Sequence, residues 1–260
     1  MKFGFIGAGN MGGALARALK GKGELYISDF IPEKAASLAK ELGGTACDNR
    51  EAAQKADYLF LGVKPYMAKE VLGGIKDELA NRAAPPVLVS MLAGTAISAL
   101  EQILGFEMPI IRIMPNIPAS SGNGMIMYAA NEKATSEQVR SFVAAMDKSG
   151  QLLPMQEKLI DAGSAVSGCG PAFVALFIEA LADGGVACGL TRADALKLAE
   201  ATVCGTAAHM LSCGIQPGPM KDAVCSPGGT TIQGVRALEE MGFRAAAMNA
   251  VIKAYEKTVK

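Results

Sequence analysis

The first half of the chain alternates short apolar runs with segments of helical periodicity. Apolar runs typical of buried strands occupy residues 3–6, 25–28, 58–63, 87–91 and 110–114. Helical patterns lie between or beside them, at residues 11–20, 32–42, 49–55, 67–79 and 97–104. Alternation of this kind implies right-handed crossovers and a mostly parallel sheet. The pattern predicts an α/β fold, with a Rossmann-type doubly wound sheet over residues 1–154.

The pattern changes after about residue 154, and no further strand is predicted. Helices are predicted at residues 158–166, 171–188 and 192–213, and from residue 231 to near the end. Gly189 and Gly214 are expected to end helices, and Thr191 to cap the next one. Residues 155–260 are therefore predicted to form an all-helical domain.

The predicted helices of this second domain are apolar on nearly every face. Residues 172–178 form one unbroken apolar row. Such a helix must be buried all round, and a domain of about 100 residues offers little room for that. A second copy of the chain would supply the missing cover, so we expect a homodimer held together by an all-helical C-terminal dimerisation domain.

Composition narrows the class of protein further. The chain has 260 residues, with 25 basic and 25 acidic side chains, and 50% of its residues are apolar. The zero net charge argues against nucleic acid and acidic membrane surfaces as partners. The longest apolar stretch carries Glu179, Asp183 and a Gly-Gly pair, so it is not expected to face lipid, and the N-terminus has no signal-peptide pattern. Six cysteines without a CxxC pair and a single His predict reduced thiols, a cytoplasmic location and no metal.

A glycine-rich loop lies between the first predicted strand and the first predicted helix. Its sequence, Gly7-Ala8-Gly9-Asn10-Met11-Gly12, matches GxGxxG. The glycines allow a tight turn, close approach of a pyrophosphate and close packing of helix on strand. The unpaired N–H groups of the helix N-terminus would face the phosphates. The loop predicts a dinucleotide site, and the alternative is a turn that only packs a helix on a sheet.

Asp29 ends the second predicted strand, where an acidic side chain can accept hydrogen bonds from the adenine ribose. A carboxylate there repels a 2′-phosphate and favours NADH, whereas nearby Lys34 favours NADPH. The choice between the two cofactors stays open. So does the alternative that Asp29 is a surface residue in the turn before Pro32.

The sequence shows no conspicuous acid–base pair. His209, the single His, lies in a predicted helix four residues before Cys213 and is expected to be a surface or structural residue. Lys64 closes a predicted strand at the edge where ligands bind, although it could simply end a turn. A cofactor site without a base suits hydride addition to an electrophilic substrate such as an iminium.

Near the C-terminus, a loop with two glycines and three hydroxyl residues precedes a predicted helix. Residues 225–231 read Cys-Ser-Pro-Gly-Gly-Thr-Thr. The N–H groups and hydroxyls of such a loop can form a nest for a carboxylate, and the alternative is an elaborate helix cap.

This loop and several other motifs closely resemble the pyrroline-5-carboxylate reductase family. The C-terminal match comprises residues 226–231, with Gly234, Val235, Leu238 and Glu239 behind them. The other matching segments are residues 5–11, 62–65, 112–118, 167–173 and 182–185. Their order and spacing cover nearly the whole chain. The chain departs from the family pattern at Ile117, Cys169 and Phe173, where the family often has Thr, Ser and Tyr.

The resemblance implies NADPH- or NADH-dependent reduction of 1-pyrroline-5-carboxylate to L-proline, at sites shared between the subunits of a homodimer. Some members of the family assemble dimers further into rings. Expected cofactor residues are Ile6, Gly7, Ala8, Gly9, Asn10, Met11, Asp29, Asn49, Gly62, Val63, Lys64, Pro65 and Ala93. Expected substrate residues are Glu157, Ser226, Gly228, Gly229, Thr230 and Thr231, with the Thr231 hydroxyl near the ring nitrogen as the catalytic group.

Two other functions are weighed against this one. A β-hydroxyacid dehydrogenase shares the two-domain plan but relies on a Lys and a nearby Asn in the long helix after the sheet, and residues 171–188 contain neither. A non-catalytic cofactor sensor would have no need of a carboxylate nest.

Overall fold

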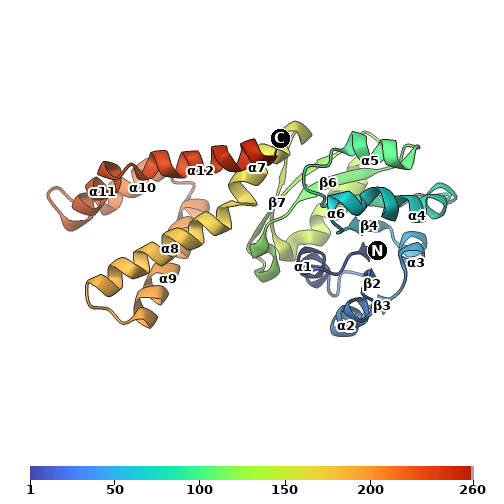
Figure 1. Ribbon diagram of the computed structural model, residues 1–260, viewed down its shortest axis with the longest axis horizontal. Coiled ribbons are helices and arrows are strands. Elements are labelled where there is room, and N and C mark those ends of the chain that lie inside the picture. Colours follow the sequence, from blue (N-terminus) through green and yellow to red (C-terminus); the bar gives the residue numbers. More distant parts are fainter. Residues whose placement is uncertain (259–260) are drawn as a thin grey trace. The chain divides into compact units, whose positions relative to one another are not determined.

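A computed structural model describes residues 1–258 of the chain. The chain divides into two compact parts, a sheet unit made mainly of Met1–Gly168 and a helical unit, Cys169–Glu256, which ends two residues before the last helix does (Figure 1).

The sheet unit contains eight strands in the order β3-β2-β1-β4-β5-β6-β7-β8. All neighbours are parallel except β6 and β7. The strands are β1 (Lys2–Ile6), β2 (Glu24–Ser28), β3 (Thr45–Ala46), β4 (Tyr58–Leu61), β5 (Val87–Ser90), β6 (Ile110–Met114), β7 (Gly124–Ala130) and β8 (Gly150–Pro154). The expected strands are confirmed, while β3, β7 and β8 were not predicted.

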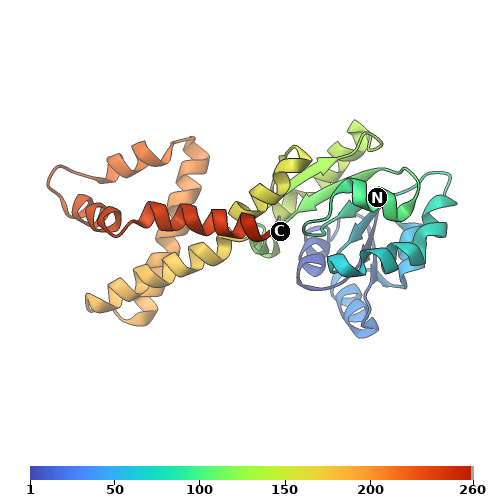
Figure 2. The ribbon, with the colours of Figure 1, turned by 45° about the horizontal axis from the view of Figure 1, so that its top comes forward.

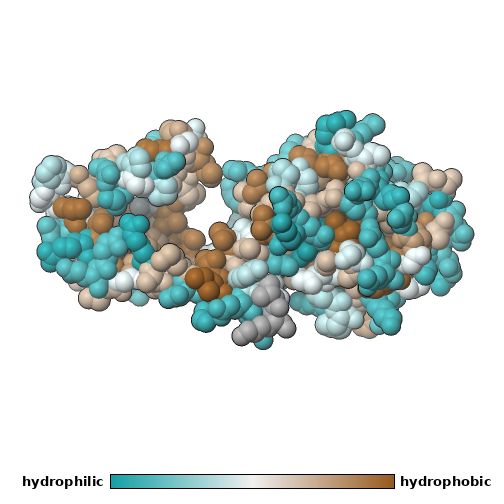
Figure 3. All heavy atoms as spheres, turned by 90° about the horizontal axis from the view of Figure 1, so that it is seen from above, coloured by the Kyte–Doolittle hydropathy of each residue, from teal (hydrophilic) through white to brown (hydrophobic). Residues whose placement is uncertain are grey.

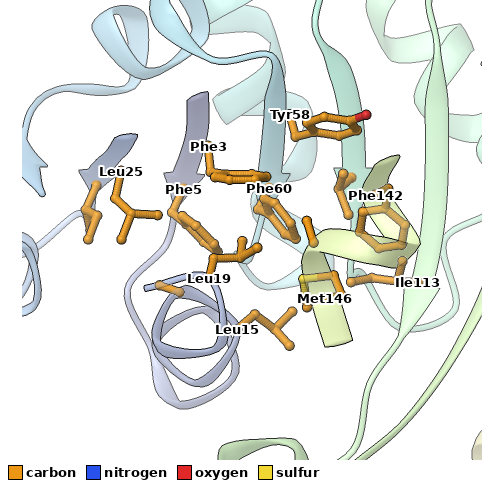
Figure 4. Packing of buried hydrophobic residues seen from close by; sticks show 14 of the residues in the cluster. Phe3, Phe5, Leu15, Leu19, Leu25, Tyr58, Phe60, Ile113, Phe142 and Met146 are labelled. Carbon is orange, nitrogen blue, oxygen red and sulfur yellow. The ribbon is translucent and has the colours of Figure 1, made fainter. Parts of the chain in front are cut away.

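Helices cover both faces of this sheet, which confirms the doubly wound prediction. Buried side chains of α1 (Asn10–Ala18), α2 (Pro32–Leu42) and α6 (Ser136–Ala145) share one core, and those of α3 (Asn49–Lys55), α4 (Ala68–Ala80) and α5 (Ile97–Leu104) share the other. Phe5 and Phe60 stack at the centre of the first core, with ring centroids 4.5 Å apart (Figure 4). Helix α6 was not predicted.

Helix α7 (Ile160–Ser167) belongs to the sheet unit, because Ile160 is buried against Met114 and Met127 of the sheet. The compact sheet unit therefore extends to Gly168, beyond residue 154. The predicted boundary between a dinucleotide-binding domain, residues 1–154, and a dimerisation and substrate-binding domain, residues 155–260, stays a prediction.

The helical unit contains α8 (Gly170–Ala187), α9 (Arg192–Cys213), α10 (Pro217–Val224), α11 (Thr230–Glu240) and α12 (Phe243–Thr258). Helices α8 and α9 lie side by side in both ribbon views (Figures 1 and 2). The Thr191 hydroxyl accepts a hydrogen bond from the Asp194 N–H, at 3.2 Å, and this confirms the predicted cap. The prediction of one continuous last helix was wrong: Gly242, at φ +72°, separates α11 from α12.

The helical unit has little core of its own. Its fully buried apolar residues are the small side chains Ala182, Ala195 and Ala199. Large apolar side chains are exposed instead, among them Leu176 and Met241, and Figure 3 shows hydrophobic patches on the surface of this unit. A single copy therefore leaves most of its apolar surface uncovered.

Candidate functional site

The site in the sheet unit begins where β1 and β4 end side by side, the point at which the strand order changes direction. The Gly62 N–H donates to the Ile6 carbonyl at 2.8 Å, and the Gly7 N–H donates to the Ser28 carbonyl at 2.8 Å. Gly7 has φ +107°, and a Cβ there would collide with the Gly62 carbonyl. Only glycine allows this close approach, at the place where open α/β sheets bind ligands.

The glycine loop fits a pyrophosphate. A Cβ on Gly12 would strike the Gly7 carbonyl, so glycine keeps α1 close to the strand, while nothing lies within 4 Å of the Cβ position of Gly9. The open side of Gly9 gives a phosphate room to approach. The N–H groups of Asn10 and Met11, in the first turn of α1, have no acceptor within their own helix. These groups can donate to phosphate oxygens.

Asp29 and Asn49 are joined to the same edge by hydrogen bonds. Asp29 Oδ2 accepts from the Ala8 N–H at 2.7 Å, and its Oδ1 accepts from the Ile31 N–H at 2.9 Å. The Ser28 hydroxyl donates to Asn49 Oδ1 at 2.6 Å. The structure therefore brings both residues beside the glycine loop, and it also gives the Asp29 carboxylate a structural role that the sequence did not show.

The nearby Cys47 is a free thiol. Burial, with the negative charges of Glu51 and Asp48, raises the pKa of its thiol to about 11. The thiol therefore stays protonated at neutral pH and is a poor nucleophile.

The expected cofactor residues 62–65 and Ala93 lie at the carboxyl ends of the neighbouring strands β4 and β5. Gly62, Val63 and exposed Lys64 follow β4, and Pro65 begins a short 3₁₀ helix. Exposed Ala93 lies in the loop between β5 and α5. The predicted cofactor residues thus come from loops that share one edge of the sheet.

Glu157 lies in a partly buried ionic network of the sheet unit, centred on the buried Arg112. Its Oε1 accepts from the Ile97 N–H at 2.7 Å and from Arg112 Nη1 at 3.3 Å. Arg112 Nη2 also donates to Asp161 Oδ1 at 2.6 Å. Sequence reasoning missed Arg112 and Asp161 as members of this network, although one signal was available: Arg112 interrupts an otherwise apolar strand.

The predicted carboxylate nest lies in the helical unit. Gly228 turns the chain at φ +68°, and the Gly229 N–H donates to the Ser226 carbonyl at 3.0 Å. Helix α11 then begins at Thr230, without a side-chain cap. Ser226, Thr230 and Thr231 are exposed. The first-turn N–H groups have no acceptor within the helix, so a carboxylate can bind there.

His209 matches the expectation of a surface residue. It is exposed on α9, with its Nδ1 3.7 Å from Cys213 Sγ. The residues that the structure describes contain no cluster of three or more metal-ligating side chains.

A doubly wound sheet with a glycine loop at its switch point, joined in one chain to a helical unit, is the architecture of a dinucleotide-dependent oxidoreductase. Comparison with known proteins identifies the family within this class. Residues 157–260 match the family described as pyrroline-5-carboxylate reductase dimerisation, and residues 2–94 match the family described as NADP oxidoreductase coenzyme F420-dependent.

Two curated relatives and one solved structure show the extent of the similarity. The chain is 40% identical to pyrroline-5-carboxylate reductase of Escherichia coli, covering 100% of this chain and 97% of that protein. It is 46% identical to the Synechocystis enzyme of the same name, covering 81% and 77%. It is also similar to the Plasmodium falciparum pyrroline carboxylate reductase with NADP bound, at 34% identity and a TM-score of 0.86, covering 99% and 97%. The chain belongs to the pyrroline-5-carboxylate reductase family.

Family membership accounts for the exposed apolar helices. By length and composition, one stretch of the described residues, Glu157–Ala187, could cross a membrane, and little of it is buried in a single chain. The matched dimerisation domain includes this stretch. The apolar surface is therefore a homodimer surface, as the sequence predicted.

Proposed function

We propose that this chain reduces 1-pyrroline-5-carboxylate to L-proline with NADPH or NADH. The observation that supports the proposal most is that one family member carries a glycine loop at the sheet's switch point and an exposed, uncapped helix N-terminus at Thr230. When bound, the cofactor supplies a hydride for the imine carbon next to the ring nitrogen. A homodimer in the cytoplasm is the proposed working form.

The glycine-loop edge holds and orients the cofactor in this proposal. The N–H groups of residues 9–11 bind the pyrophosphate, and Asp29 and Asn49 contact the adenosine end. Residues 62–65 and Ala93 line the nicotinamide end. This assignment is supported by the shared edge on which the structure brings these loops together.

The nest orients the substrate through its carboxylate. Ser226 and the backbone of Gly228, Gly229 and Thr230 donate hydrogen bonds to that group. The Thr231 hydroxyl donates to the ring nitrogen, directly or through water, and assists the arrival of the proton there. The exposed N-terminus of α11 supports this arrangement, since its charge preference favours an anion.

The direct test is an assay of the purified chain with the cyclic imine and each cofactor, following loss of the reduced cofactor and appearance of L-proline. We expect reduction with at least one of them. Oxidation of 3-hydroxyisobutyrate without imine reduction would favour the dehydrogenase alternative. Cofactor binding with neither activity would favour a sensor.

A further inference from the structure

Arg112 is a buried cation in the middle of an apolar strand. Its side chain is 3% exposed, and it donates to Glu157 and Asp161 as described above. Its Nε is buried and has no hydrogen-bond partner among the residues that the structure describes. A buried guanidinium costs desolvation energy that a hydrophobic residue would avoid, so stability alone does not account for it.

Within this network, Glu157 contacts the N-terminus of α5. Ala96, the N-cap residue of α5, makes no side-chain cap, and Glu157 Oε1 accepts from the Ile97 N–H instead. A carboxylate at a helix N-terminus also interacts favourably with the helix dipole. Glu157 thus caps a helix 60 residues away in sequence.

This cap anchors the loop that carries Ala93. Other hydrogen bonds of residues 91–96 are longer than the Glu157 contact. Leu92 N–H to Ser90 Oγ, Thr95 N–H to the Leu92 carbonyl and Thr95 Oγ1 to the Ala93 carbonyl are 3.4 Å, and Met91 N–H to the Leu61 carbonyl is 3.3 Å. At the helix end, the Ala96 carbonyl accepts from the Ala99 N–H at 3.1 Å. The charge-assisted bond at Ile97 is 2.7 Å. Bonds to ionised groups are about twice as strong as neutral ones. The Glu157 contact is therefore a strong restraint at the helix end of this loop, in addition to the helical bonds that the Ala96 carbonyl accepts.

We propose that Glu157, held in place by Arg112, is a positioning residue that fixes the Ala93 loop against the nicotinamide end of the bound cofactor. This rests on the proposed function, which places Ala93 at that end. Glu157 Oε1 is shared between two donors, and the Glu157 side chain is 31% exposed. Glu157 acts through its hydrogen bond to the Ile97 N–H, so this role requires no direct contact between Glu157 and the imine.

The test compares Glu157→Ala and Glu157→Gln with Glu107→Gln. Glu107 lines the same 460 Å³ cavity as Glu157 but pairs with Lys133 at the surface, so its variant is the matched control. Two measurements do not depend on turnover: the Kd of NADPH without imine, and hydrogen exchange of residues 91–97 in the cofactor-free protein. KM for the imine is measured in parallel.

Glu157→Ala is expected to raise the Kd of NADPH about tenfold and to speed exchange at Ile97, because the loop loses its anchor. Glu157→Gln should have a smaller effect, about threefold, because its amide oxygen still accepts from the Ile97 N–H. Should the Ala variant not fold, the Gln variant alone must still differ from Glu107→Gln, which should match the wild type.

A normal Kd and slow exchange in the Glu157 variants, with a raised imine KM, would overturn the proposal and make Glu157 a substrate contact. Failure of the proposed function has a different outcome. The wild-type chain would then bind NADPH and not reduce the imine, while the Kd and exchange differences among the variants would remain.

Discussion

The two units differ in how they bury their apolar side chains. The sheet unit buries large side chains such as Phe3, Phe5 and Phe60 within a single chain. The helical unit buries only small alanines and exposes Leu176 at 68% and Met241 at 84%. Burial of apolar area is the main stabilising term in folding, so the first unit is complete alone and the second depends on its partner copy.

This difference also separates the two halves of the proposed chemistry. The cofactor edge is built on strands whose cores are finished within the chain. The carboxylate nest is built on helices whose stability comes from dimerisation. Cofactor binding should therefore tolerate loss of the dimer better than imine reduction does.

The largest expected effect comes from a charge on the dimer surface. Leu176→Glu would bury a carboxylate in an apolar interface, which favours the monomer. We expect sedimentation to show monomers at micromolar concentration and imine reduction to be lost, while NADPH still binds the sheet unit. Leu153→Glu, at a half-exposed position on β8, is the control and should remain dimeric and active. An active Leu176→Glu monomer would contradict both the dependence on the dimer and the comparison of the two units.

A cavity in the core of the sheet unit should destabilise that unit and leave the dimer intact. Phe60 is fully buried and stacks on Phe5, so Phe60→Ala removes a ring that the surroundings cannot replace. Such substitutions cost about 3–5 kcal/mol. We expect thermal unfolding to begin in the sheet unit at lower temperature, with the dimer retained by sedimentation. A dimer that dissociates before the sheet unit unfolds would show that the two units are not independent.

The sequence predicted the sheet unit well where one chain contains all the relevant contacts. The buried parallel strands are apolar runs, and α2, α3 and α5 begin and end at the predicted residues. The missed strands are the two edge strands, β3 and β8, and β7, which pairs with β6 and β8. Strand β3 has two residues, and β7 and β8 mix glycine and partly exposed positions. Their structure comes from pairing, which no local pattern encodes.

The site was predictable to the extent that it depends on local sequence. The glycine loop and the nest are each contiguous, so their composition revealed them. The Arg112 network joins β6, α5 and α7 through side chains far apart in the chain. Its distances come from the fold, and a lone Arg in an apolar run was its only trace in the sequence.

A smaller effect is expected at Thr231, which tests the proposed chemistry of the helical unit. Loss of a neutral donor that matters mainly in the transition state costs about 1–3 kcal/mol, or on the order of 10- to 100-fold in kcat/KM. Thr231→Ala should lower kcat while NADPH and proline still bind, and Thr231→Ser should recover much of the rate. Full kcat with weaker substrate binding in Thr231→Ala would make Thr231 part of the carboxylate clamp.

The smallest effect is expected at Asp29, and it separates two roles of one carboxylate in the sheet unit. Its oxygens accept from the Ala8 and Ile31 N–H groups, yet each keeps a further lone pair for a ribose hydroxyl. Asp29→Ser removes a negative charge that opposes a 2′-phosphate. The ratio of kcat/KM for NADPH over NADH should therefore rise, by roughly 3- to 10-fold for a partly exposed charge.

The matched control for Asp29 is Asp48→Ser. Asp48 caps α3 through the Glu51 N–H at 2.8 Å, and serine caps helices equally well, so this variant loses a nearby charge without losing its fold. Its cofactor ratio should stay at the wild-type value. If Asp29→Ser weakens both cofactors equally and leaves the ratio unchanged, the carboxylate only braces the glycine loop. In that case its bond to the Ala8 N–H, and not the ribose, accounts for its position at the end of β2.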